Sequence, residues 1–301
     1  MNQLFKLPLG ALRRCVANFI ALGLMLGVPI RGLAERPGSG TFTTIDFPGA
    51  LSTAYLPQIW IRINAEGQIV GGYQDTSGKG HGFLLSNGNF FTVDGPGAIF
   101  SELNAINPEG DIVGDYVDAN SNFVAFLLSK GKLTRISFPG ATETSLNSIN
   151  PRGDIVGYYT VAGGPRHGYL LREGIFTSFD FPGANLTVAS AINTEGKIAG
   201  IYRDTAGNMH GYLLSDGVFT PIDVPGAIFT TAIDINPEGT IVGRYNTPDG
   251  KGHGYVLRGG QFTTIDVPGS VLSFATGINA KSDIVGKYMT ADGKFHGFLL
   301  Q

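Results

Sequence analysis

The feature that most constrains the fold of this chain is a unit that recurs every 43 residues. An Ile-Asn pair appears six times at that period, beginning at Ile63, Ile106, Ile149, Ile192, Ile235 and Ile278. Pro-Gly pairs keep the same period, except that five extra residues lie between the first pair, which ends at Gly49, and Ile63. Because the other units carry no insertion, each unit is expected to contact its neighbours in the same way.

Within one unit the pattern predicts four short strands. Residues 107–110, Asn-Pro-Glu-Gly, match a type I turn. Lys130-Gly131 suits a two-residue turn with positive φ, and a Gly holds the second place at each equivalent turn. The segments between these turns are rich in β-branched and aromatic residues. We therefore expect strands at 101–106, 111–117, 123–128 and 133–137.

A histidine of the third strand is expected to pair with an aspartate of the fourth. The two-residue turn fixes a register in which His81 faces Asp94. The unit that has Val124 in place of the His also has Ser137 in place of the Asp. A catalytic dyad is the alternative, but copies spread around a ring serve no single substrate. The predicted structural pairs are His81–Asp94, His167–Asp180, His210–Asp223, His253–Asp266 and His296–Asp46.

These histidines are not expected to bind a metal. If the units form a ring, one His on each third strand would lie roughly 15 Å or more from the central axis and from its counterparts, because neighbouring strands are ~4.8 Å apart. Zinc needs all its ligands within ~2.3 Å of one point. Asp118, Asn120 and Asn122 resemble the start of a calcium loop, but Phe123 replaces its Gly and the distal Glu is missing. We expect no metal and no cofactor.

The two ends of the repeats complement each other, which predicts a closed ring. Residues 41–46 read as a lone fourth strand, and residues 296–300 as a lone third strand. Pairing them would join His296 to Asp46 and remove an exposed sheet edge. The prediction is an all-β, six-bladed β-propeller over residues 41–301, with four antiparallel strands per blade and the first strand innermost. An open β-solenoid is the alternative, and it would leave both end strands unpaired.

The first 34 residues have the layout of a secretory signal peptide. Basic residues precede an uncharged run from 16 to 30, and cleavage is expected after Ala34. That run is shorter than the roughly 20 residues that span a bilayer, so no membrane span is expected after cleavage. An uncleaved anchor is the alternative. Residues 35–40 read as a linker. Either way we expect the repeats to be secreted, periplasmic or at the cell surface.

Composition argues against two further classes of protein. The single cysteine, Cys15, lies in the leader, so disulfides cannot stabilise the mature chain. The leader also holds four of the 21 basic residues and none of the 24 acidic ones. The resulting excess of acidic residues argues against a nucleic-acid partner. A monomer is expected.

The repeated motif resembles the HAF family of probable extracellular repeats, which is named after a His-Ala-Phe tripeptide. Gly replaces the family's Ala in the matching tripeptides, which begin at His81, His167, His210, His253 and His296. The Ile-Asn-x-x-Gly and Ile-Val-Gly-x-Tyr segments are also similar to that family. The resemblance covers the chain after the leader. It implies export and a repeated β fold, and it implies no established activity.

Positions that vary between units are the candidates for specificity, because variation on a fixed scaffold is where binding is encoded. The insertion places Tyr55 and Trp60 beside the first strand of the first unit. The other candidate residues come from positions of the first strands that differ between units. The predicted channel-mouth binding surface is Tyr55, Trp60, Arg62, Asn104, Asn147 and Asp234. The alternative is that these residues only fill the channel. The tyrosines that end the second strands are expected to pack between blades.

The expected function is a binding or scaffolding module for an extracellular protein or glycan. The alternative is an extracellular lyase or hydrolase with its site at the channel mouth. An enzyme would need an acid–base pair near the axis, for which Arg62 and Asp234 are the candidates in the sequence. Perturbed titratable groups in the channel would favour the enzyme.

Overall fold

The structure is a computed structural model that describes residues 40–55 and 59–301. The predicted signal peptide, and the predicted linker up to residue 39, lie outside the described residues. Within the described ranges, no helix is both long and apolar enough to cross a bilayer.

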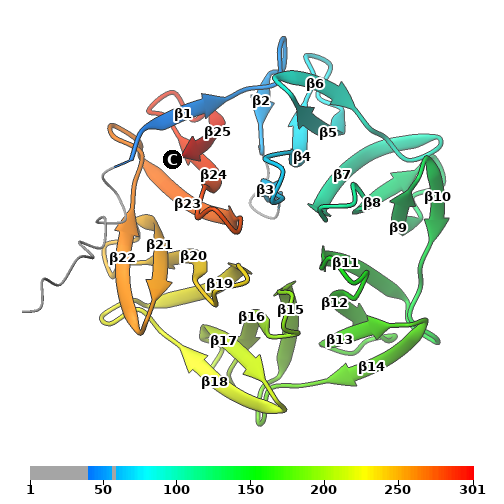
Figure 1. Cartoon of the computed structure of the whole chain (residues 1–301). Coiled ribbons are helices and arrows are strands. Elements are labelled where there is room, and N and C mark those ends of the chain that lie inside the picture. Colours follow the sequence, from blue (N-terminus) through cyan, green and yellow to red (C-terminus); the bar gives the residue numbers. More distant parts are fainter. Residues whose placement is uncertain (1–39, 56–58) are drawn as a thin grey trace, which may run out of the picture. The chain divides into compact units, whose positions relative to one another are not determined.

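The described residues form a ring of six blades around a central axis (Figure 1). Blade 1 contains β2 (Ser52–Thr53), β3 (Arg62–Ile63), β4 (Ile69–Gln74), β5 (Gly80–Ser86) and β6 (Asn89–Thr92). Blade 2 contains β7 (Ala98–Ile106), β8 (Ile112–Asp118), β9 (Phe123–Ser129) and β10 (Lys132–Arg135). Blade 3 contains β11 (Glu143–Ile149), β12 (Ile155–Thr160), β13 (Arg166–Arg172) and β14 (Ile175–Phe179). Blade 4 contains β15 (Leu186–Ile192), β16 (Ile198–Arg203), β17 (Met209–Ser215) and β18 (Val218–Ile222). Blade 5 contains β19 (Phe229–Ile235), β20 (Ile241–Asn246), β21 (Gly252–Arg258) and β22 (Gln261–Ile265). Blade 6 contains β23 (Leu272–Ile278), β24 (Ile284–Met289), β25 (Phe295–Leu300) and β1 (Phe42–Ile45).

The predicted six-bladed propeller is therefore the observed fold. The first strands of neighbouring blades contact one another around the axis, so they are innermost, as expected. Blade 1 departs from the others because the five-residue insertion splits its inner strand into β2 and β3, which both pair with β4. A single backbone bridge, between Gly80 and Phe100, also joins the sheets of blades 1 and 2.

The ring closes as the end strands predict. β1 pairs with β25, with Phe42 opposite Leu300 and Ile45 opposite Gly297 (Figure 1). The Thr41 amide continues the ladder by donating to the carbonyl of Gln301 at 2.9 Å. Blade 6 thus takes its outer strand from the start of the repeats, which removes the free edge of β25.

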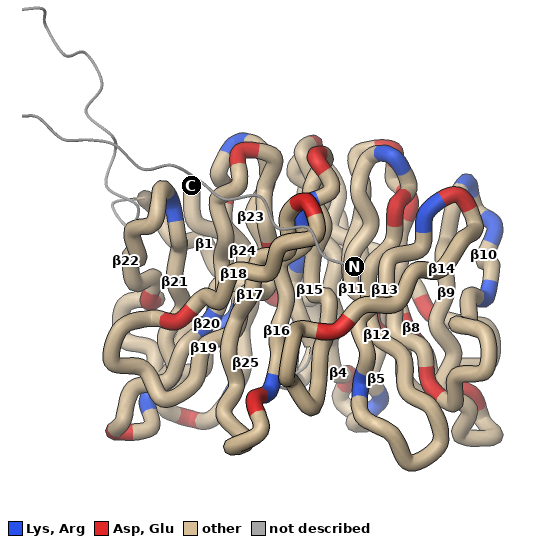
Figure 2. The backbone as a smooth tube through the Cα atoms, turned by 90° about the horizontal axis from the view of Figure 1, so that it is seen from below, with Lys and Arg blue, Asp and Glu red and all other residues tan. Residues whose placement is uncertain are grey.

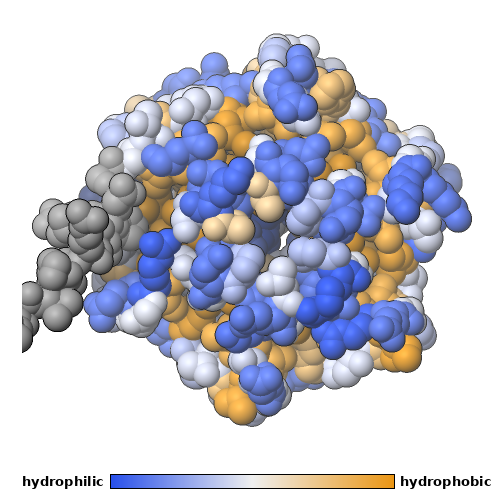
Figure 3. Space-filling model, viewed as in Figure 1, coloured by the Kyte–Doolittle hydropathy of each residue, from blue (hydrophilic) through white to orange (hydrophobic). Residues whose placement is uncertain are grey.

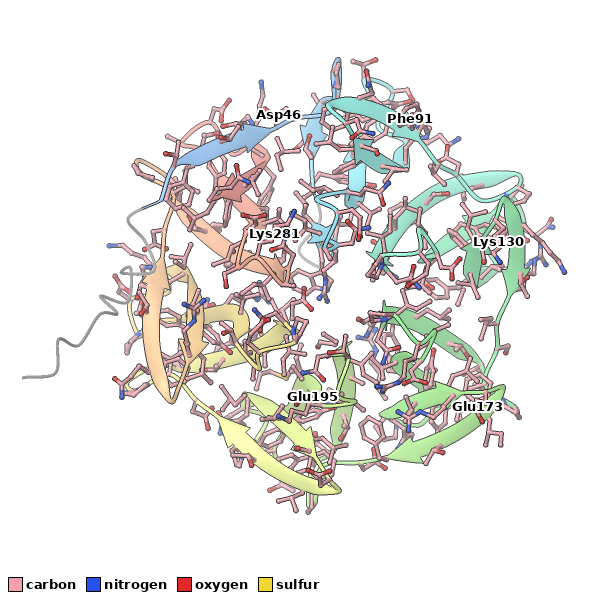
Figure 4. All side chains as sticks on the ribbon, viewed as in Figure 1. Asp46, Phe91, Lys130, Glu173, Glu195 and Lys281 are labelled. Carbon is pink, nitrogen blue, oxygen red and sulfur yellow. The ribbon has the colours of Figure 1, made fainter. Side chains whose placement is uncertain are left out.

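The turns between third and fourth strands set the register of each blade. Asn87 and Gly88 both have positive φ, at 51° and 75°, which is the conformation of a type I′ turn. Leu85 then lies opposite Phe90, the predicted pairing. Figure 4 shows that residues of these turns, such as Lys130 and Glu173, lie farther from the axis than Glu195 and Lys281. Glu195 and Lys281 belong to the turns between first and second strands, which we call the inner turns.

Each blade has one aromatic side chain at its centre, contributed by the residue two places after the His slot. These residues are fully buried, at 0% exposure: Phe83, Phe126, Tyr169, Tyr212, Tyr255 and Phe298. The Tyr169 hydroxyl donates to the Ser145 carbonyl at 2.9 Å, where the inner strand bulges between Leu146 and Ser148. A side chain at Gly157 would collide with that same carbonyl, so the glycine in Ile-Val-Gly-x-Tyr makes room for the bulge.

The tyrosines that end the second strands pack between blades, as predicted. Tyr159 stacks on Phe138, which belongs to the crossing from the preceding blade, with ring centroids 3.7 Å apart. Tyr73 and Tyr202 make the same stack on the equivalent crossing residues. On its other face Tyr159 stacks on His167. The contact therefore joins one blade to the histidine of the next.

Six asparagines form a closed ring at the inner turns, a feature that was not predicted from the sequence. Each side-chain amide donates to the backbone carbonyl of the equivalent residue 43 positions on, and the last donates to the first. The members of this Asn ring are Asn64, Asn107, Asn150, Asn193, Asn236 and Asn279. The same asparagines use Oδ1 to accept backbone amides within their own turns. The ring ties all six blades together at one end of the channel.

Candidate functional site

A salt bridge across the channel separates two cavities. Arg62 of blade 1 donates to Asp234 of blade 5 at 2.9 Å and to the Ser190 carbonyl of blade 4 at 3.1 Å. On one side lies a mouth of about 180 Å³, lined by the Asn ring and the residues beside it. On the other side lies a cavity of about 590 Å³, which Arg62 also lines. Arg62 therefore contacts both cavities, whereas Asp234 lines only the smaller one.

We call the larger space the channel cavity. It lies between blades 1 to 4 and has a volume within the range of small-ligand sites. Its walls combine aromatic rings with carboxyl, amide and guanidinium groups. The lining residues used below are Trp60, Phe100, Glu102, Asn104, Asp115, Phe123, Glu143, Ser145, Asn147, Tyr158 and Arg166. On the face seen in Figure 3, hydrophilic residues predominate around the axis.

The chemistry of the channel comes from one pair of facing residues in each of blades 2 to 6. One member lies on the first strand, and the other occupies the slot before the repeated Tyr on the second strand. The facing pairs are Glu102 and Asp115, Ser145 and Tyr158, Val188 and Ile201, Thr231 and Arg244, and Phe274 and Lys287. The backbone around each pair is the same, so their differences make the channel asymmetric.

Glu102 and Asp115 form a buried pair of carboxyl groups. They lie opposite each other on antiparallel strands, where Cβ atoms are about 5 Å apart. Asp115 Oδ2 accepts hydrogen bonds from Asn104 at 2.7 Å and from Ser145 at 2.8 Å. Asp115 Oδ1 and Glu102 Oε2 have no hydrogen-bond partner among the described residues. Two carboxyl groups in this setting favour the protonated form.

The pKa values of both carboxyl groups are raised. Burial, and then the neighbouring charge of Asp115, raise the pKa of Glu102 to about 8, although Lys287 acts in the opposite direction. Burial also raises the pKa of Asp115 to about 7, against the hydrogen bonds from Ser145 and Asn104. Near neutral pH the pair therefore holds a proton that an exposed pair would have lost.

Blade 3 contributes a second acidic group with its own partners. The Tyr158 hydroxyl donates to Glu143 at 2.6 Å, and burial is the main reason that the pKa of Tyr158 is raised. Arg166 lies 3.8 Å from Glu143 and 4.2 Å from the centre of the Tyr158 ring. The charge of Glu143 is thus balanced locally, unlike that of the Glu102–Asp115 pair.

The opposite half of the channel is basic and aromatic. Arg244 lies between the rings of Phe229 and Phe274, with its guanidinium 4.9 Å and 4.7 Å from their centres. Burial lowers the pKa of Arg244 to about 10. The ammonium of Lys287 donates to the Ile59 carbonyl at 2.9 Å, and burial lowers its pKa as well. This half is filled, so the open space lies on the acidic side.

Four of the six residues predicted as a binding surface line the channel cavity: Trp60, Arg62, Asn104 and Asn147. Asn104 and Asn147 also brace neighbouring blades, by donating to the carbonyls of Leu146 and Ala189. Asp234 lines the smaller mouth.

Tyr55 is the remaining member of the predicted surface. It is not among the residues that line either cavity and packs near Gly80. Burial and the charge of Glu102 raise the pKa of Tyr55 to about 12. Glu102, Asp115 and Tyr158 were not among the residues predicted from the sequence. The missed signal was the slot before the repeated Tyr, which holds a different residue type in each unit: Gly72, Asp115, Tyr158, Ile201, Arg244 and Lys287.

The predicted His–Asp hydrogen bonds are present in all five units. The Nδ1–carboxylate distances are 2.7 Å for His81–Asp94, 2.9 Å for His167–Asp180, 2.8 Å for His210–Asp223, 2.8 Å for His253–Asp266 and 2.9 Å for His296–Asp46. Their contribution to stability stays a prediction. A cavity of about 300 Å³ lies beside one pair at the junction of blades 4 and 5.

Charged residues lie mainly in the loops at the two ends of the strands (Figure 2). In the part of the chain that the structure describes, no three His, Cys, Asp or Glu side chains gather in a way that could hold a metal ion. Asp118 instead accepts hydrogen bonds from the backbone amides of Asn120 and Asn122 within its own turn.

No protein-family model matches the chain, and no curated protein matches it. The resemblance to the HAF family thus has no independent support. Solved structures do match. A fungal lectin from Aleuria aurantia, described as a six-bladed β-propeller with fucose recognition, is 15% identical with a TM-score of 0.56, over 82% of this chain and 93% of that one.

Two further solved structures are similar to the same degree. AofleA from Arthrobotrys oligospora is 14% identical, with a TM-score of 0.56 over 87% of each chain. The SapL1 lectin in complex with α-methyl fucoside is 13% identical, with a TM-score of 0.55 over 84% of this chain and 95% of that one. At this level of identity the likeness establishes the fold that the three share with this chain, a β-propeller.

Proposed function

We propose that the chain is an exported glycan-binding propeller that holds its ligand in the channel cavity. The observation that carries the proposal is the cavity itself, about 590 Å³ in volume, with aromatic rings beside polar groups. Sugars present an apolar face that stacks on aromatic rings, and hydroxyls that need hydrogen-bond partners. Trp60, Phe123 and Tyr158 offer the rings.

The fold comparison supports a glycan over a protein ligand. Two of the similar propellers are described as lectins that recognise fucose or a fucoside. Export of the repeats rests on the layout of the leader, and both export and a monomeric state belong to the proposal. An extracellular protein partner stays an expectation from the sequence.

Screening of the mature chain on a glycan array tests this function, followed by titration of the best ligand in solution. Phe123, at the rim of the cavity, is 39% exposed, so its replacement should leave the fold intact. We expect Phe123→Ala to weaken binding about fivefold or more through lost stacking. Phe91→Ala, which removes an exposed ring from the outer strand β6, is the matched control and should bind like the wild type. An array without ligands, or equal losses in the two variants, would reject the proposal.

A second candidate function is glycan hydrolysis or elimination in the same cavity. The observation that favours it is the Glu102–Asp115 pair, because glycosidases use one protonated and one ionised carboxyl group. Incubation of the bound glycan with the wild type, followed by measurement of new reducing ends, distinguishes the two candidates. Product that Glu102→Gln abolishes would establish the enzyme, and unchanged glycan would leave the binder.

A further inference from the structure

The channel cavity contains two buried carboxyl oxygens that nothing in the described part of the chain satisfies. Glu102 is 9% exposed and Asp115 is 1% exposed, and both line the cavity. Glu102 Oε2 and Asp115 Oδ1 each lack a hydrogen-bond partner there. Buried polar atoms normally have partners because an unmet one is costly. Carboxyl oxygens without hydrogen-bond partners, in a cavity large enough for a ligand, indicate that a donor group of the ligand binds them.

The other charged groups of the cavity already have partners. Glu143 accepts from Tyr158 and lies beside Arg166. The terminal nitrogens of Arg62 bind Asp234 and the Ser190 carbonyl, whereas its Nε has no hydrogen-bond partner among the described residues. Lys287, whose charge acts on Glu102, donates to the carbonyl of Ile59. The acceptors that the cavity leaves for a ligand are therefore concentrated at the carboxyl pair.

We propose that the ligand is an amino sugar whose protonated amine binds between Glu102 and Asp115. This inference rests on the proposed function, since it names the class of glycan. An ammonium group has three N–H donors, so it can donate to both unmet oxygens at once, and its charge offsets the carboxylates. A neutral hydroxyl has a single donor, and it carries no charge that would favour the ionised form of the pair. The Trp60 and Tyr158 rings flank the cavity and can stack on the sugar.

Calorimetric titration with two matched ligands tests the inference: a glucosamine trimer with free amines and its fully N-acetylated counterpart, at about pH 6, where the amine is charged. We expect the wild type to bind the free-amine trimer at least about tenfold more tightly, as charged hydrogen bonds imply. We also expect proton release on binding, seen as a heat that depends on the buffer, because the ammonium stabilises the ionised carboxyl pair.

Two variants and one control assign the preference to the pair. Glu102→Gln and Asp115→Asn should each bind the two trimers with similar affinity, while Glu195→Gln on an exposed inner turn should keep the wild-type preference. Equal binding of the trimers by the wild type, or tighter binding of the acetylated one, would overturn the inference and leave glycan binding intact. If neither trimer and no glycan on the array binds, the inference and the proposed function both fall.

Discussion

At the scale of single residues, the channel shows how one backbone position can acquire different chemistry. Asp115 and Tyr158 occupy the same slot in neighbouring blades and meet the same kind of backbone. Asp115 faces another carboxyl, whereas Tyr158 faces Ser145 and donates to Glu143. The first arrangement raises two acid pKa values, and the second balances one acid with a donor.

The carboxyl pair predicts a specific dependence of stability on pH. Folding raises the pKa of Glu102 from 4.5 to about 8 and that of Asp115 from 3.8 to about 7. Between these values the folded chain binds more protons than the unfolded chain, so the free energy of unfolding falls as pH rises. The expected loss is at most about 1.4 kcal/mol per pH unit for each group.

Urea unfolding at several pH values between about 5 and 8 measures this effect. Glu102→Gln and Asp115→Asn should each flatten the decline relative to the wild type. The other titratable groups are common to all three proteins, so their contributions cancel in the difference. Parallel curves for the wild type and both variants would contradict the raised pKa values.

At the scale of the elements, the inner turns do two jobs with one side chain. The Oδ1 of Asn193 accepts the amides of Glu195 and Lys197 in its own turn, and its Nδ2 donates to the Asn236 carbonyl of the next blade. The turn and the contact between blades are therefore coupled. This is why the Ile-Asn pair keeps its period around the whole ring.

Replacement of one member of the Asn ring should lower the free energy of unfolding by more than the loss of a single exposed hydrogen bond does. Asn193 is 3% exposed, and Asn193→Ala removes the acceptor of the Glu195 and Lys197 amides together with the bond to the Asn236 carbonyl. We expect a loss of about 2–3 kcal/mol in the free energy of unfolding, measured by urea denaturation. Asn208→Ala is the control, because it removes a single side-chain hydrogen bond, to Asp204, in an exposed turn. Equal losses at the two positions would show that the ring adds nothing.

The blades were predictable from the sequence because the turns between their third and fourth strands allow only one strand register. The Gly at the second place of each outer turn fixed the register, which placed the His opposite the Asp. The division of the first inner strand into β2 and β3 was not predictable in the same way. The insertion has no equivalent in the other units, so the repeat gives no template for it.

At the scale of the whole ring, departures from symmetry create the site. Arg62 bridges to Asp234 across the channel and lines the cavities on both sides of that bridge. Large basic and aromatic residues then fill the half formed by blades 5 and 6. The cavity remains beside blades 2 and 3, where the facing pairs are acidic or hydroxyl-bearing.

The candidate site was predictable in its location and not in its chemistry. Variable slots on the innermost strand pointed to the channel, and Trp60, Arg62, Asn104 and Asn147 do line its larger cavity. The second strand was overlooked because its flanking Val, Gly and Tyr repeat so regularly. Arg62 and Asp234 were predicted from the sequence as a candidate pair near the axis, and in the structure they form a salt bridge across the ring.

The number of glycans bound by each chain tests the central claim most directly. The channel cavity exists once in the ring, whereas grooves such as the one beside His210 and Asp223 lie at a junction that recurs between blades. Calorimetric titration of the best array ligand should therefore give a stoichiometry of one, and Phe123→Ala should weaken that single site. Several equivalent sites per chain, with an affinity that Phe123→Ala leaves unchanged, would contradict binding in the channel.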